Sequence, residues 1–136
     1  MMHPQVWKGS RFSIEREEDG RAGKVVFRFA GPFTSRDMYG SLSPDALRDI
    51  FTVSDSSGLP ALHVLDLSGV PYMDSAGLGV IATHYARCRA EGVHLKAVGV
   101  CPRVLEQFEM TRMNRFIPVS GSNEEPHAQM NHKRPI

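Results

Sequence analysis

Residues 74–82 contain a serine and two glycines at spacings that several kinds of chemistry use. Gly77, Gly79 and Ala82 fit the Gly-x-Gly-x-x-Gly/Ala pattern of dinucleotide-binding folds, but an isolated match of this kind is weak. In the genuine pattern the glycines follow the strand directly, and an acid comes about 20 residues later. Here about nine residues separate the preceding apolar run from Gly77, and residues 96–99 supply no acid. We therefore expect no dinucleotide and no other cofactor.

Ser75 is the candidate nucleophile of this segment. A hydrolase elbow needs Gly-x-Ser-x-Gly, and Met73 stands where the first glycine is required. No histidine is placed beside Ser75 by the sequence, so we expect the protein not to be an enzyme. Cys88 and Cys101 match no metal or redox spacing, and we expect both to be reduced, buried thiols. The six histidines are dispersed, which predicts no metal site: His3, His63, His84, His94, His127 and His132.

The simplest role for Ser75 is structural. Apolar residues at helical spacing predict a helix over residues 76–91, and a serine just before it would cap a backbone N–H group. Asp74 either positions the Ser75 hydroxyl for recognition or makes an Asx turn. Gly77 and Gly79 each cost about 1 kcal/mol relative to alanine inside a helix. They indicate close approach by a partner or a neighbouring strand, or they only relieve crowding. The expected apolar stripe is Leu78, Ile81, Ala82, Tyr85 and Cys88.

The elements around this segment follow from hydrophobic periodicity and turn residues. The expected order is strands 12–18 and 24–30, a helix starting at Ser43-Pro44-Asp45, strand 61–67, helix 76–91, strand 93–99, a helix from Pro102 and a short strand 116–119. Strand–helix–strand crossovers imply parallel pairing, and the opening hairpin adds an antiparallel edge. The sequence predicts an α/β fold, with a mixed sheet of about four to five strands and helices packed on it.

The chain of 136 residues fits one domain. We expect an N-terminal extension over residues 1–11, the domain over 12–120, and a flexible polar tail over 121–136. No apolar run approaches the ~20 residues of a membrane span, and no signal-peptide pattern is present, so we expect a cytoplasmic protein without membrane insertion. The formal net charge of +1 argues against nucleic-acid binding.

Residues 64–81 resemble the signature of STAS domains, the family of bacterial anti-sigma-factor antagonists (anti-anti-sigma factors). In that family a buried strand ends in a Leu-Asp-Leu-Ser-Gly-Val-like stretch. A Met/Ile-Asp-Ser-Ser/Ala-Gly-Leu-Gly segment then opens the central helix. The resemblance continues through Val98-Gly99, Val104-Leu105-Glu106 and Phe116, and it covers about residues 12–119. It implies the STAS fold.

The resemblance also implies a role for Ser75, because the serine after the aspartate is the family's phosphoacceptor. A phosphate there would add about −1.5 to −2 charge at the positive end of the helix dipole. The helix would tolerate this charge, whereas an acidic partner surface would be repelled. By resemblance, the unphosphorylated protein binds an anti-sigma factor that is also the serine kinase. A PP2C-type phosphatase resets this partner switch, which controls transcription.

The expected partner surface consists of the start of the helix over 76–91, the exposed side of that helix, and a loop earlier in the chain. The residues expected to contact the partner at the helix start are Asp74, Ser75, Ala76, Gly77, Leu78 and Gly79. Those expected in the loop are Gly31, Pro32, Phe33 and Thr34. The loop departs from the family, which usually has a Gly-Glu-Leu/Ile-Asp-like segment there. The acid is missing, and Asp37 comes three residues later. Without this acid, the loop lacks the residue on which nucleotide contact or kinase recognition would rely.

A second function class stays open. STAS-like domains also serve as constitutive interaction subunits of transporter assemblies, such as lipid transporters, or of ligand-sensing assemblies, without a phosphorylation cycle. A neighbouring gene for a serine kinase or a PP2C-type phosphatase would favour sigma-factor control. A neighbouring gene for a transporter ATPase would favour the subunit role.

Overall fold

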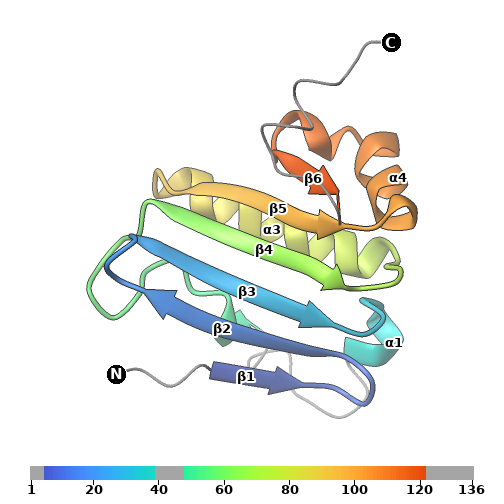
Figure 1. Ribbon diagram of the computed structural model, residues 1–136, viewed down its shortest axis with the longest axis horizontal. Helices are drawn as coiled ribbons and strands as arrows, with labels where there is room; N and C mark the ends of the chain where they lie inside the picture. Colours follow the sequence, from blue (N-terminus) through green and yellow to red (C-terminus); the bar gives the residue numbers. More distant parts are fainter. Residues whose placement is uncertain (1–4, 39–47, 122–136) are drawn as a thin grey trace.

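The computed structural model describes residues 5–38 and 48–121, which form a mixed α/β sheet with helices (Figure 1). The elements described are β1 (Gln5–Lys8), β2 (Ser13–Asp19), β3 (Lys24–Ala30), α1 (Ser35–Met38), β4 (Leu62–Gly69), α3 (Ser75–Ala90), β5 (His94–Val100), α4 (Pro102–Met110), a 3₁₀ turn (Met113–Arg115) and β6 (Val119–Gly121). The strands lie in chain order, β1 to β6. β1, β2 and β3 pair antiparallel, and the pairs from β3 to β6 are parallel. The predicted fold class is confirmed, with six strands rather than four to five.

The additional strand is β1, which lies within the stretch 1–11 that the sequence set apart as an extension. Trp7 pairs opposite Ile14 of β2 and is only 4% exposed. Its ring meets Phe12 edge-on at 5.8 Å. A four-residue strand with one buried side chain gives too short an alternation to be recognised in a sequence.

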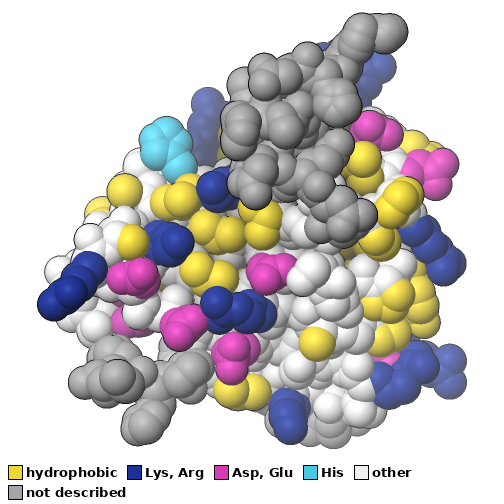
Figure 2. Space-filling model, viewed as in Figure 1, with side chains coloured by type: hydrophobic (Ala, Val, Ile, Leu, Met, Phe, Trp, Pro, Cys, Tyr) yellow, Lys and Arg dark blue, Asp and Glu magenta, His cyan; other side chains and the backbone are white. Residues whose placement is uncertain are grey.

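The sheet buries one face and leaves the other open. Register places Phe27 of β3 between Arg16 of β2 and Leu65 of β4, and all three side chains are buried. Helix α3 lies behind the sheet in the view of Figure 1, so it covers this face. On the open face Arg28 lies 2.7 Å from Glu17 and 3.6 Å from Glu15. Acidic and basic side chains mingle over the strands there (Figure 2).

Helix α3 has nearly the predicted bounds, but its buried face differs from the expected stripe. Gly77, Ile81, His84 and Cys88 are its buried residues, whereas Ala82 is exposed. The expected stripe was therefore wrong at Ala82 and missed His84. A glycine lets the helix approach its neighbours closely, and a buried polar histidine gives no hydrophobic signal.

Some expectations concern other parts of the chain. The helix start at residues 43–45 lies outside the described residues. The expected tail over 121–136 lies outside them too, except for Gly121, which is the last residue of β6. The last strand runs over β6, later than the expected 116–119; Pro118 has no N–H to donate to a ladder, although its carbonyl accepts from Ala97 N at 2.9 Å. Among the residues described, no helix has both the length and the apolar character to cross a membrane.

Candidate docking site at the start of helix α3

Asp74, and not Ser75, caps helix α3. One carboxylate oxygen of Asp74 accepts hydrogen bonds from the backbone N of Ala76 at 3.0 Å and of Gly77 at 3.1 Å. Ser75 is the first helical residue, and its side chain is exposed. This corrects the expected cap by one position. Both residue types are good caps, so the sequence alone does not choose between them.

The second carboxylate oxygen of Asp74 binds the start of α1. It accepts from the backbone N of Ser35 at 3.0 Å and lies 3.5 Å from the Ser35 hydroxyl. Burial alone would raise the pKa of Asp74, but the hydrogen bonds from Ser35, Gly77 and Ala76 outweigh it and lower the pKa. An ionised Asp74 thus joins α1 to α3 directly beside Ser75.

The loop over residues 31–34, which the family resemblance assigned to the partner surface, lies against the α3 start. Phe33 N donates to Tyr72 O at 3.0 Å, and Asp74 N donates to Phe33 O at 3.2 Å. The Phe33 side chain, however, is fully buried and stacks on Phe12 at 4.6 Å. It belongs to the core and is not available as a contact surface, which corrects that expectation. Gly31, Pro32 and Thr34 are partly exposed.

The two glycines at the α3 start have different surroundings. A Cβ on Gly77 would collide with the carbonyl oxygen of Phe33 and lie 3.0 Å from its Cγ. A Cβ on Gly79 would meet nothing within 4 Å. Packing inside the domain therefore explains why residue 77 is a glycine. It does not explain Gly79, which lies on the surface with open space around it. We call the accessible set the α3 tip: Asp74, Ser75, Ala76, Leu78 and Gly79.

Asp37 is the first acidic residue after the loop over residues 31–34, where the family's usual acid is missing. Its side chain is buried and hydrogen-bonded. Its carboxylate accepts from the Thr34 hydroxyl at 2.6 Å and from Arg11 at 3.0 and 3.4 Å. The Thr34 hydrogen bond, followed by that from Arg11, lowers the pKa of Asp37. Asp37 thus holds the loop in place from beneath.

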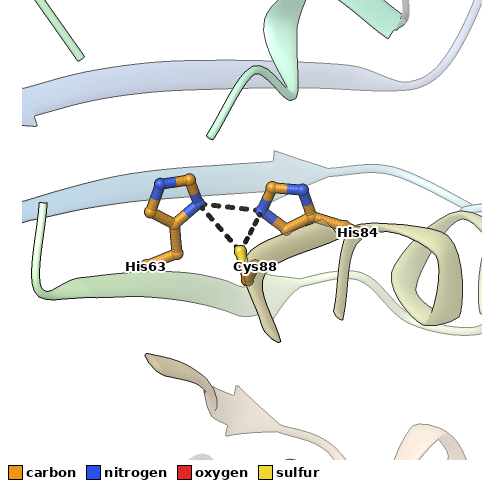
Figure 3. A group of neighbouring side chains, drawn as sticks. All are labelled: His63, His84 and Cys88. Atoms are coloured by element: carbon orange, nitrogen blue, oxygen red, sulfur yellow. Dashed lines mark hydrogen bonds between the residues drawn. The ribbon is translucent and has the colours of Figure 1, made fainter. Parts of the chain in front are cut away.

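A cluster that the sequence analysis missed lies under the sheet (Figure 3). His63 of β4 comes within 2.8 Å of His84 of α3, and the Cys88 sulfur lies 3.6 and 3.5 Å from these two ring nitrogens. The prediction that the histidines are dispersed is wrong for His63 and His84, which lie 21 residues apart in the chain and meet in the fold. The available signals were the four-residue spacing of His84 and Cys88 and the inward position of His63 within an apolar strand. Cys88 is a buried free thiol as expected, whereas Cys101 is partly exposed.

Residues 13–125 match the sequence model of the STAS domain. The chain is 33% identical over 58 residues to the "Anti-sigma-B factor antagonist" of Bacillus subtilis (strain 168), and this match covers 43% of the chain. The matched stretch spans about half, 53%, of that relative's own length.

Two solved structures share the fold at low sequence identity. An anti-sigma factor antagonist from Mycobacterium paratuberculosis superposes with a TM-score of 0.63 at 22% identity, covering 90% of this chain and 95% of that one. A sulfate transporter family protein from Wolinella succinogenes superposes with a TM-score of 0.58 at 21% identity, covering 72% and 76%. These neighbours share the architecture of this chain.

Proposed function

Because the chain belongs to the STAS domain family, we propose that it is an anti-sigma-factor antagonist, a non-enzymatic regulator that binds an anti-sigma factor and is switched by phosphorylation of Ser75. The curated relative named as such an antagonist supports this class. The observation that carries the proposal is the position of Ser75, exposed at the first residue of α3 on a tip held in place from both sides.

The way Asp74 caps the helix bears on what a phosphate would do. Asp74 already accepts the N–H groups of Ala76 and Gly77, so a phosphate on Ser75 would not need to replace the cap. It would add about −1.5 to −2 charge beside an ionised carboxylate. The fold would persist while the charge of the α3 tip changed strongly, which is what a binding switch requires.

The partner is expected to pack closely on the α3 tip. Gly79 presents bare backbone with open space above it, and Leu78 offers a partly exposed apolar side chain beside Ser75. In the proposed cycle the anti-sigma factor binds the unphosphorylated tip and, as the serine kinase, transfers phosphate from ATP to Ser75. A PP2C-type phosphatase restores the hydroxyl.

A constitutive STAS subunit of a transporter assembly is the second candidate. It is favoured by the structural likeness to a sulfate transporter family protein. In that role the α3 tip would bind its partner permanently, and Ser75 would act only as an exposed first-turn residue.

Mass spectrometry after incubation with ATP and any serine kinase encoded beside this gene tests the proposal. We expect a mass increase of about 80 Da, one phosphate, mapped to Ser75. The increase should vanish in Ser75→Ala and persist in Ser35→Ala, a matched control because Ser35 is exposed and lies close to Asp74. Absence of phosphate on Ser75 with every neighbouring kinase would favour the constitutive subunit.

A further inference from the structure

The buried cluster of His63, His84 and Cys88 brings three metal-ligating side chains together. His84 and Cys88 lie one turn apart on α3 and share its sheet-facing side. His63 faces them from β4, and their exposures are 0% for His63, 1% for His84 and 0% for Cys88. Figure 3 shows both imidazole rings and the sulfur directed toward one another.

The two sulfur–nitrogen separations suit a tetrahedral ion, and the nitrogen–nitrogen separation is short for one. Zinc binds nitrogen at about 2.0–2.1 Å and sulfur at about 2.3 Å, which places tetrahedral ligands roughly 3.5 Å apart for sulfur–nitrogen pairs and roughly 3.3 Å for nitrogen pairs. The sulfur–nitrogen distances are 3.6 and 3.5 Å. The two ring nitrogens are 2.8 Å apart, a hydrogen-bond distance, and would have to separate by roughly 0.5 Å.

The hydrogen bonds around the cluster already orient one ligand. His63 Nε2 lies 2.9 Å from the carbonyl oxygen of Val53, which can only accept, so this nitrogen carries the proton. The lone pair of His63 Nδ1 therefore points into the cluster. A backbone carbonyl on the far nitrogen is the usual outer support of a metal-bound histidine.

His84 can adopt the matching tautomer. Its Nε2–H donates to His63 Nδ1, and its Nδ1 is buried without a hydrogen-bond partner among the described residues. When Nε2 coordinates a cation, the proton moves to Nδ1. The Cys88 thiol loses its proton to solvent, so binding releases one proton per ion. Arg16, the cation that acts on all three groups, is paired with Glu18 at 3.3 Å.

We propose that His63 Nδ1, His84 Nε2 and Cys88 Sγ form a binding site for one divalent transition-metal ion of the zinc type. Nitrogen and thiolate ligands select this class over Mg²⁺ or Ca²⁺. The three side chains fill three of four positions, and a water molecule completes the set. The three side chains are buried, so the ion enters when α3 and β4 separate locally.

Cobalt titration of the full chain, stripped with EDTA, tests the site. Co²⁺ reports tetrahedral geometry through visible bands and a thiolate ligand through near-ultraviolet charge transfer. We expect one equivalent to produce both signals and Zn²⁺ to abolish them. Cys88→Ala should lose the charge-transfer band and bind Co²⁺ at least tenfold more weakly. Cys101→Ala, which removes the other thiol, should behave as wild type.

Two results would overturn the site. One is a folded wild-type protein that gives no cobalt–thiolate band. The other is a band that survives in Cys88→Ala or disappears in Cys101→Ala. If Cys88→Ala does not fold, thermal unfolding of the wild type decides: Zn²⁺ should raise Tm through mass action, and an unchanged Tm at saturating Zn²⁺ contradicts the site.

Discussion

The backbone nitrogen of Ser35 lies 3.0 Å from a carboxylate oxygen of Asp74, so residues 39 positions apart close the turn that presents Ser75. The other Asp74 oxygen caps α3. One side chain therefore fixes both the helix start and the adjoining loop, and the position of the Ser75 hydroxyl depends on it.

Replacing Asp74 by alanine should lower the free energy of unfolding by about 1–2 kcal/mol, because an N-cap is lost together with the Ser35 contact. Asp74→Asn keeps an accepting oxygen and should lose less. Urea denaturation monitored by circular dichroism measures both. Equal stability of Asp74→Ala and wild type would show that the cap contributes nothing.

The two glycines of the α3 start offer a matched pair. Gly77→Ala should destabilise the fold by about 1–3 kcal/mol, because the new methyl group collides with the Phe33 backbone. Gly79→Ala should preserve or raise stability by up to about 1 kcal/mol, since alanine favours the helix and meets no atom.

The two variants should rank differently in their affinity for the anti-sigma factor than in their stability. Folded Gly77→Ala should bind more tightly than Gly79→Ala. Gly79→Ala places a methyl group on the α3 tip and should weaken binding, as measured by isothermal titration calorimetry. Unchanged affinity for Gly79→Ala would place the partner elsewhere on the domain.

Arg16 should be the most sensitive polar residue in the described part of the fold. Its buried guanidinium donates to the carbonyl oxygens of Ile50 at 3.0 Å, Thr52 at 2.6 Å and Ser54 at 2.9 Å. Arg16→Met should cost about 3 kcal/mol or more in unfolding free energy, because buried carbonyls lose their donors. Arg28→Ala, which removes only exposed ion pairs, should cost less than about 1 kcal/mol. Similar losses in the two variants would contradict this assignment.

Stability of the metal-free protein should fall as pH is lowered below about 6.5. Burial lowers the pKa of His63 to about 4, and burial followed by the His63 charge lowers that of His84 to about 3. Arg16 and Arg87 also disfavour the protonated rings, and Asp55 favours protonated His63. The unfolded chain therefore binds more protons between pH 6.5 and these values. The histidines' contribution to the free energy of unfolding is fully present above pH 6.5. It decreases as the pH falls, with a slope approaching about 1.4 kcal/mol per pH unit for each histidine.

Urea midpoints between pH 7.5 and 4.5 with EDTA present test this dependence. Asp and Glu titrate with ordinary pKa values of about 3.9 and 4.3, so the histidines dominate the part of this window between about pH 6.5 and 5.5. His84→Asn should reduce the slope. A wild-type stability that is flat across the window would mean that the two rings are not held neutral by the fold.

Sequence reasoning succeeded where a periodic apolar pattern is long enough. The bounds predicted for β3 are those observed, and α3 is displaced by one residue, because β-branched and aromatic alternation and helical spacing are local properties. The assignment of residues 31–34 and the α3 start to one partner surface came from the family resemblance rather than from local pattern, and it stays a prediction.

Buried polar residues were beyond such reasoning. Arg16 stands at an inward position of β2, but its burial depends on carbonyls 34 to 38 residues away. His63 and His84 meet only after β4 and α3 pack. A polar side chain gives no hydrophobic signal, and its partners come from distant segments. The one-residue error at the α3 cap has another cause, since aspartate and serine suit the cap equally well.

The affinity of the cognate anti-sigma factor for the unmodified protein and for the protein phosphorylated at Ser75 tests the central claim most directly. Calorimetry on both forms, with circular dichroism to show that the fold is unchanged, supplies the comparison. The account predicts that phosphorylation weakens binding by about 100-fold or more, equivalent to about 2.7 kcal/mol. Equal affinities of the two folded forms would contradict a switch at Ser75.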